Sequence, residues 1–135
     1  MVCLDAPRTS HSLGWTHPCC YVEPNSTVSA STFDSNRALE GGALHLSSSC
    51  TLNIHNSTFS NNLADATGSG GALYVAAGSS MQASGVMFIS NTAHTGGGLA
   101  VLGRTAVATL TNCTLSACRA TSSGGGLYAG SAATM

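Results

Sequence analysis

The sequence predicts an all-β fold, a parallel β-helix (solenoid) of about three to four coils, and three observations support this prediction. A two-part motif recurs along the chain, apolar residues alternate with polar ones, and no window of ten or more residues carries the apolar stripe of a helix. Self-similarity at a period of about 20 to 50 residues is typical of stacked repeats. Fold and function are therefore both encoded in the repeat.

The motif reads Phe-x-x-Asn-x-Ala, a short gap, then Gly-Gly-x-Leu. Complete copies begin at Phe33, Phe59 and Phe88, and in a fourth copy Leu115 and Cys118 replace Phe and Asn. The Phe positions (33, 59, 88, 115) are 26, 29 and 27 residues apart. From each Leu position (44, 73, 99) to the next Phe position the count is 15, 15 and 16, whereas from Phe to Leu it ranges from 11 to 14. The variation lies in one loop, between Ala and the first Gly.

Each half of the unit predicts a strand with one buried face, because its apolar residues lie two apart. The pairs after Gly-Gly are Leu44 and Leu46, Leu73 and Val75, and Leu99 and Val101. A second set precedes the next Phe position and consists of Leu52 and Ile54, which are also two apart, and then Leu110 and Cys113, which are three apart.

In a parallel β-helix, equivalent residues of successive coils lie above one another, about 4.8 Å apart. We therefore expect two ladders: a stack of Phe33, Phe59 and Phe88 continued by Leu115, and an inward row of Asn36, Asn62 and Asn91 that bonds turn backbone. The recurring Ala marks a tight position, and the Gly pairs allow a corner with positive φ. Residues 1–25 are expected to form an irregular Cys- and Pro-containing segment, and 26–135 the repeats.

Composition excludes several classes of partner. Nine residues are charged, none is lysine, and the net charge is −1, so there is no footprint for nucleic acid. No stretch reaches the roughly 18 to 20 apolar residues of a membrane-spanning helix. The start lacks the pattern of a signal peptide, and the end directly follows a Gly-Gly-x-Leu block, which we interpret as truncation of a longer array.

The paired blocks Phe-x-x-Asn and Gly-Gly-Ala-Leu resemble the repeat of the chlamydial polymorphic membrane proteins, over roughly residues 26 to 129. That family is similar to right-handed parallel β-helix proteins with a pectin-lyase-like fold. The resemblance implies a right-handed β-helix and a surface-exposed adhesin, extracellular or at the cell surface, carried in the family by an outer-membrane barrel. No barrel and no signal are visible in this chain.

An enzymatic alternative would need carboxylates gathered on one outer face, as in polysaccharide-cleaving β-helices. The acidic residues are Asp5, Glu23, Asp34, Glu40 and Asp65, and the position of Asp34 continues as Ser60, Ile89 and Ser116. A pair of Asp34 and Glu40 across a turn, with Arg37 between them, is one reading; exposed corner charges are the other.

Cysteine, histidine and asparagine give further candidates. A metal site would involve His17, Cys19, Cys20 and either Cys3 or His11, but this spacing matches no zinc template, so we expect neither metal nor cofactor. Six cysteines allow 15 pairings, of which Cys113 with Cys118 is the first disulfide to test. Glycosylation sequons begin at Asn25, Asn56 and Asn112, and chance also explains them in a chain so rich in Asn, Ser and Thr.

The leading functional hypothesis is a non-catalytic, structural or adhesive β-helix fragment. Its longest variable loop would bind a protein or glycan, and consists of Asp65, Ala66, Thr67, Gly68 and Ser69. The alternatives are a fragment of a polysaccharide-cleaving enzyme and a truncated product without independent function. Open coil ends also predict edge-to-edge self-association.

Overall fold

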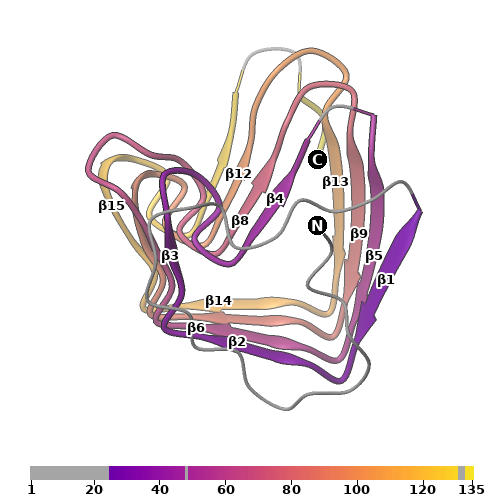
Figure 1. The fold of residues 1–135 in the computed structure, drawn as a ribbon, viewed down its shortest axis with the longest axis horizontal. Helices are drawn as coiled ribbons and strands as arrows, with labels where there is room; N and C mark the ends of the chain where they lie inside the picture. Colours follow the sequence, from indigo (N-terminus) through magenta and orange to yellow (C-terminus); the bar gives the residue numbers. More distant parts are fainter. Residues whose placement is uncertain (1–24, 48, 131–132) are drawn as a thin grey trace.

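The computed structural model describes residues 25–47, 49–130 and 133–135, in which all regular structure is β-strand. The expected segment 1–25 lies, apart from Asn25, outside the described residues. Four strands make one coil, and four coils follow one another (Figure 1). The strands of the first two coils are β1 (Ser26–Ser29), β2 (Thr32–Asp34), β3 (Arg37–Ala38), β4 (Leu44–Leu46), β5 (Thr51–His55), β6 (Thr58–Ser60), β7 (Leu63–Ala64) and β8 (Leu73–Val75). Those of the third and fourth are β9 (Ser80–Ser84), β10 (Met87–Ile89), β11 (Thr92–Thr95), β12 (Leu99–Val101), β13 (Val107–Thr111), β14 (Thr114–Ser116), β15 (Arg119–Ser123) and β16 (Leu127–Ala129).

Equivalent strands of the four coils pair in parallel into four sheets. We name them sheet I (β1, β5, β9, β13), sheet II (β2, β6, β10, β14), sheet III (β3, β7, β11, β15) and sheet IV (β4, β8, β12, β16). The predicted parallel β-solenoid is confirmed. Its register follows the motif: Phe33 pairs with Phe59, Phe59 with Phe88, and Phe88 with Leu115.

Each described corner of a coil contains a residue with positive φ, and the corner before β13 contains a second one, Gly103. Apart from Gly103, this residue recurs in the described residues at the same position of successive coils, with φ between 46° and 76°. The four rows are Ala30, Asn56, Gly85 and Asn112; Ser35, Asn61, Ser90 and Ala117; Gly41, Gly70, Gly96 and Gly124; and Ser49, Gly78 and Thr105. Only the third row is all glycine. A left-handed residue turns the chain sharply within one position, and it thereby allows flat strands of two to five residues between the corners.

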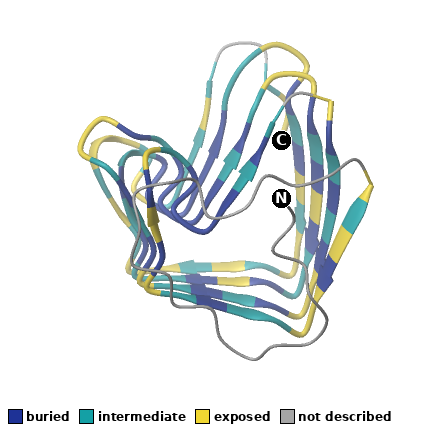
Figure 2. Ribbon diagram, in the orientation of Figure 1, coloured by how far each residue is buried: buried dark blue, intermediate teal, exposed yellow. Residues whose placement is uncertain are grey.

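The main core lies between sheets I, II and IV and is filled by the alternating apolar residues of their strands (Figure 2). Phe59, Phe88, Leu73 and Leu99 are fully buried there. Phe33 and Phe59 stack with ring centroids 4.7 Å apart, and Phe59 and Phe88 at 5.2 Å. The aromatic rings therefore follow the coil spacing along the middle of the solenoid.

Asn36, Asn62 and Asn91 line the corner between sheets II and III, where all three are buried. The Asn36 Nδ2 donates to Asn62 Oδ1 at 2.9 Å, and the Asn62 Nδ2 donates to Asn91 Oδ1 at 2.9 Å. Each of the two later amides also donates to a backbone carbonyl of the preceding coil, Asn62 to Phe33 and Asn91 to Phe59. These two backbone carbonyls lie near the corner, and the asparagine side chains supply them with hydrogen-bond donors.

In the first three coils, the second glycine of the Gly-Gly pair lies directly against the backbone of sheet III. A Cβ on Gly71 would come within 2.7 Å of the Thr92 backbone nitrogen, and one on Gly42 within 2.8 Å of the Leu63 nitrogen. This contact separates the main core from a narrow lobe, visible at the left of Figure 1. Ala38, Ala64 and Ala93 are buried outside the main core, and a larger side chain would not fit beneath the chain that closes the lobe.

The two ends of the solenoid differ in burial. In the first coil Val28 and Phe33 are 2% and 4% exposed. In the fourth coil their counterparts Leu110 and Leu115 are only partly buried, as is Leu127. The described part of the fourth coil therefore presents inner side chains at its outer edge.

Candidate functional site

The three described carboxylates lie in three separate places. Asp34 is on the outer face of sheet II, where its Oδ1 accepts from Ser60 Oγ at 2.6 Å and from Asn61 Nδ2 at 2.9 Å, and its Oδ2 from Ser35 Oγ at 2.9 Å. These hydrogen bonds, that of Ser60 first, lower the pKa of Asp34. Each bond is made by a surface polar group, so this carboxylate is held in its ionised form at a corner.

Glu40 lies beside the outer face of sheet IV. Its Oε2 is 3.9 Å from His45 Nδ1, and the His45 ring packs against Tyr74 with centroids 4.8 Å apart. Burial lowers the pKa of His45, against an opposing effect of Glu40. Burial and the Glu40 charge both raise the pKa of Tyr74. This small cluster belongs to the first two coils.

Of the two readings of Asp34, Arg37 and Glu40, the exposed corner charges agree better with the structure than a group across one turn. Arg37 instead contacts the following coil, where its Nε donates to Asp65 Oδ1 at 2.7 Å. The reason is the stacking: β3 and β7 pair with Arg37 opposite Leu63, and this brings Asp65 within reach of the guanidinium. Interactions between coils replace those expected between sequence neighbours.

The loop 65–69 is anchored on both sides. The Asp65 amide donates to the Ala38 carbonyl, and the Gly68 carbonyl accepts from the His94 amide, each at 2.9 Å. Ser69 bridges to Thr95, and its carbonyl accepts from the Gly41 amide. A Cβ on Gly68 would collide with the Leu39 carbonyl, so glycine is needed there. Of the five candidate residues, Gly68 and Ser69 are thus built into the scaffold, and Ala66 and Thr67 form the exposed tip.

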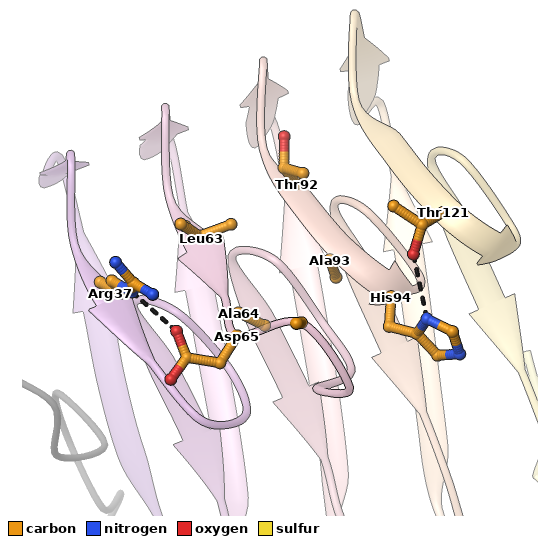
Figure 3. A pocket seen from close by; sticks show the side chains of 9 residues that line it. Arg37, Leu63, Ala64, Asp65, Thr92, Ala93, His94 and Thr121 are labelled. Atoms are coloured by element: carbon orange, nitrogen blue, oxygen red, sulfur yellow. Dashed lines mark hydrogen bonds and ion pairs between the residues drawn. The ribbon is translucent and has the colours of Figure 1, made fainter.

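Asp65 and Ala66 line a pocket of about 300 Å³ on the outer face of sheet III (Figure 3). The remaining lining residues come from all four coils and are Arg37, Leu63, Ala64, Thr92, Ala93, His94 and Thr121. The Arg37–Asp65 ion pair lies at one end of the pocket and the hydrogen-bonded pair His94–Thr121 at the other, with Leu63, Ala64 and Ala93 between them. This volume is at the lower end of the range of ligand pockets.

Two outward rows of side chains run along this face. The first consists of Arg37, Leu63 and Thr92, which line the pocket, and Arg119, which continues the row in register beyond the pocket lining. The second follows the alanine position and holds Asp65, His94 and Thr121. His94 Nδ1 is 3.0 Å from Thr121 Oγ1. The Asp65 side chain points toward Arg37 and away from His94, so within the described part of the chain no carboxylate orients this imidazole for proton transfer.

Sequence reasoning singled out Asp65 and Ala66 but missed the other pocket residues. Arg37, Leu63, Thr92 and Arg119 share a position yet differ in chemistry, so no motif marks them. Only their position in the repeat could have identified these residues: the residues immediately before and after the recurring Ala point outward on the same face.

The thiols of Cys113 and Cys118 are free in the structure. Cys113 Sγ donates to the Thr111 carbonyl at 3.4 Å, as Ser57 Oγ does to His55 at 2.8 Å, and Cys118 Sγ donates to the Phe88 carbonyl at 3.4 Å. The candidate disulfide is therefore not formed, because each sulfur occupies a different corner as a weak substitute for Ser or Asn. The histidine and cysteines of the candidate metal site lie outside the described residues, within which no three metal-ligating residues cluster.

The sequon asparagines occupy exposed positions. Asn56 and Asn112 are equivalent residues of the first corner row, with φ of 47° and 51°, and Asn25 also has positive φ, at 62°. Asparagine tolerates this conformation better than most residues, which accounts for its presence without a glycan. All three side chains remain open to modification.

One comparison with known proteins gives a match. Residues 56–76 match the Chlamydia polymorphic membrane protein (Chlamydia_PMP) repeat. This stretch contains the Phe59, Asn62 and Gly70-Gly71 positions of the second coil. No curated protein and no solved structure gives a significant match. In the described residues there is no helix long and apolar enough to cross a membrane. The chain is thus a parallel β-helix that carries a repeat similar to that of the Chlamydia polymorphic membrane proteins.

Proposed function

We propose that the chain is a non-catalytic binding module of a cell-surface or secreted protein, which holds a protein or glycan against the outer face of sheet III. One observation carries this proposal: the pocket on that face is lined by residues of all four coils and by the tip of the longest variable loop. A ligand seated there would contact the stack as a whole. The similarity to a membrane-protein repeat supports a location at a surface.

The scaffold suits binding because the face is already ordered. Asp65 is held by Arg37 and by the Ala38 carbonyl, and His94 by Thr121 and by the Gly68 carbonyl. Little side-chain entropy remains to be lost when a ligand is bound at such a site. Sequence variation at the loop tip would change the ligand while leaving the coil register intact.

A polysaccharide-cleaving activity has less support. That hypothesis requires carboxylates that converge in one groove. Asp34, Glu40 and Asp65 instead lie beside the outer faces of three different sheets, and each contacts a different partner. Among the described residues that line the pocket, Asp65 is the single carboxylate, and it pairs with Arg37.

The proposal is tested by a substitution that fills the pocket with a bulky side chain. Ala66 is exposed at the pocket wall, so Ala66→Trp should occupy the pocket without disturbing the core. The control is Gln82→Trp, at an exposed position of sheet I. We expect the fluorescently labelled Ala66→Trp variant to lose binding to cultured-cell monolayers while the Gln82→Trp variant keeps it. Equal binding by both variants, with unchanged circular dichroism, would remove sheet III from the proposal.

Self-association through the fourth coil is a separate proposal. It is supported by the partial exposure of Leu110, Leu115 and Leu127 beside strand edges. Since the counterparts of these residues in the first coil are buried, the contact would join the fourth coils of two copies. Light scattering during size-exclusion chromatography should then give a dimer that Leu115→Arg converts to a monomer; monomeric wild type at high concentration would refute it.

A further inference from the structure

We propose that the ligand of the sheet III pocket is an extended peptide segment that carries acidic side chains at positions i and i+4 and an apolar one between them. This inference rests on the proposed binding function and specifies its ligand. It depends on the spacing of two arginines, the nature of the surface between them, and the charge balance of the face.

The spacing comes from the register. Arg37 and Arg119 occupy the same outward position on the first and fourth coils, with Leu63 and Thr92 between them. Three steps of about 4.8 Å separate their backbones by about 14 Å along the solenoid axis. In an extended peptide, residues i and i+4 point to the same side and lie about 13 Å apart. A peptide lying along the axis would therefore present two such side chains to the two guanidinium groups.

The surface between the arginines is suited to a small apolar side chain. Leu63 is half-buried at its centre, and Ala64, Ala66 and Ala93 complete the apolar part of the lining. None of the described residues that line the pocket is aromatic, although stacking on aromatic rings is a common means of holding flat faces of ligands. A peptide side chain is favoured over a sugar ring for this reason. Thr92, His94 and Thr121 add hydrogen-bonding groups for peptide backbone along the same line.

The charge balance favours an anionic ligand. Two of the three described arginines, Arg37 and Arg119, lie on this face, and Asp65 is the one described carboxylate that opposes them. Asp65 accepts from the Nε of Arg37, and the side chain of Arg37 is 59% exposed, so its outer N–H groups can reach a second carboxylate. In the described part of the chain no ion pair involves Arg119. The face therefore carries about one unit of uncompensated positive charge.

The test uses the full chain and a pentapeptide with blocked ends, glutamate at positions 1 and 5 and valine at position 3. Two comparison peptides have glutamine at positions 1 and 5, or glutamates at positions 1 and 4, which point to opposite sides of an extended strand. Binding is followed by the shifts of backbone amide resonances at about 50 mM salt, where surface charges are weakly screened. We expect shifts confined to sheet III, and weaker binding of both comparison peptides.

Matched variants locate the charges. Arg119→Gln should weaken binding about threefold, the size expected for an exposed charge pair, whereas Arg104→Gln, at an exposed arginine outside the face, should have no effect. Asp65→Asn should strengthen binding, because Arg37 then serves the ligand alone. Equal effects of the two arginine substitutions, or equal binding of the glutamine peptide, would overturn the proposal.

An oligogalacturonate serves as the acidic saccharide probe. If it shifts the sheet III resonances and the pentapeptide does not, the ligand class is wrong while the binding face stands. If Ala66→Trp has no effect on cell binding and yet the pentapeptide binds sheet III, the peptide specificity stands and the proposed surface role fails.

Discussion

The third and fourth coils share a register but differ in how their interiors are completed. In the third coil Phe88 and Asn91 are fully buried, and the asparagine amide bonds the carbonyl of Phe59. In the fourth coil Leu115 and Cys118 take these places and are only partly buried. The Cys118 thiol bonds the equivalent carbonyl, that of Phe88, at 3.4 Å. The same backbone geometry is thus held by strong interactions within the stack and by weaker ones at its end.

The largest expected effect concerns the aromatic position. Phe59→Ala should lower the free energy of unfolding by about 4 kcal/mol, because it leaves a cavity between Phe33 and Phe88. Leu115→Ala should cost about 1 kcal/mol, since this residue is already partly exposed. Urea denaturation of both variants measures the difference. Similar costs would mean that the fourth coil is as well packed as the third.

The asparagine position should show the next largest effect. Asn62→Ala removes an acceptor used by the Asn36 backbone and side-chain amides and a donor to Phe33, so we expect a loss of about 3 kcal/mol. Cys118→Ala removes one weak bond at a half-exposed site and should cost less than about 1 kcal/mol. Hydrogen exchange of the Asn36 amide provides a local readout. Unchanged protection in Asn62→Ala would contradict the ladder.

Restoring the asparagine of the motif in the fourth coil should reduce the difference in stability between the third and fourth coils. In Cys118→Asn, the new amide can donate to the Phe88 carbonyl and its oxygen can accept from Asn91 Nδ2, as the asparagines do in the preceding coils. We expect a gain of about 1 kcal/mol in unfolding free energy. Thermal unfolding of this variant beside Cys113→Ser measures the gain. A loss of stability would show that the corner of the fourth coil cannot accommodate the larger amide.

The smallest expected effect is the dependence of stability on pH, which tests the half-buried surroundings of His45 in the first coil. Burial holds the pKa of His45 below its ordinary value near 6.5, so the unfolded chain takes up the proton first as the pH falls. Stability contributed by neutral His45 is full above that value and decreases as the pH falls through it toward the lowered folded pKa. His45→Gln should flatten this decrease relative to the wild type. Parallel pH profiles for the two proteins would contradict the half-buried environment of His45.

The sequence was sufficient for the coils and their register, because the constant Leu-to-Phe spacing determines which residues stack. It was insufficient for three of the four corners: Ser35, Asn61, Ser90 and Ala117 turn the same corner, but no residue type unites them. The pocket could not be predicted from the sequence for a related reason. Inner positions are constrained by packing and repeat their residue type, whereas outer positions such as Leu63 and Arg119 meet solvent and vary freely. A recurring pattern identifies a core, but a binding face has to be found from the arrangement in space.

The anchoring of loop 65–69 has a consequence for engineering. Asp65 at its start and Gly68 and Ser69 at its end are fixed to neighbouring coils, whereas Ala66 and Thr67 have exposed side chains. A foreign peptide inserted between Ala66 and Thr67 would leave every interaction between coils in place. The solenoid could then serve as a display scaffold, and equivalent insertions in successive coils would present several grafted segments about 4.8 Å apart in a single array.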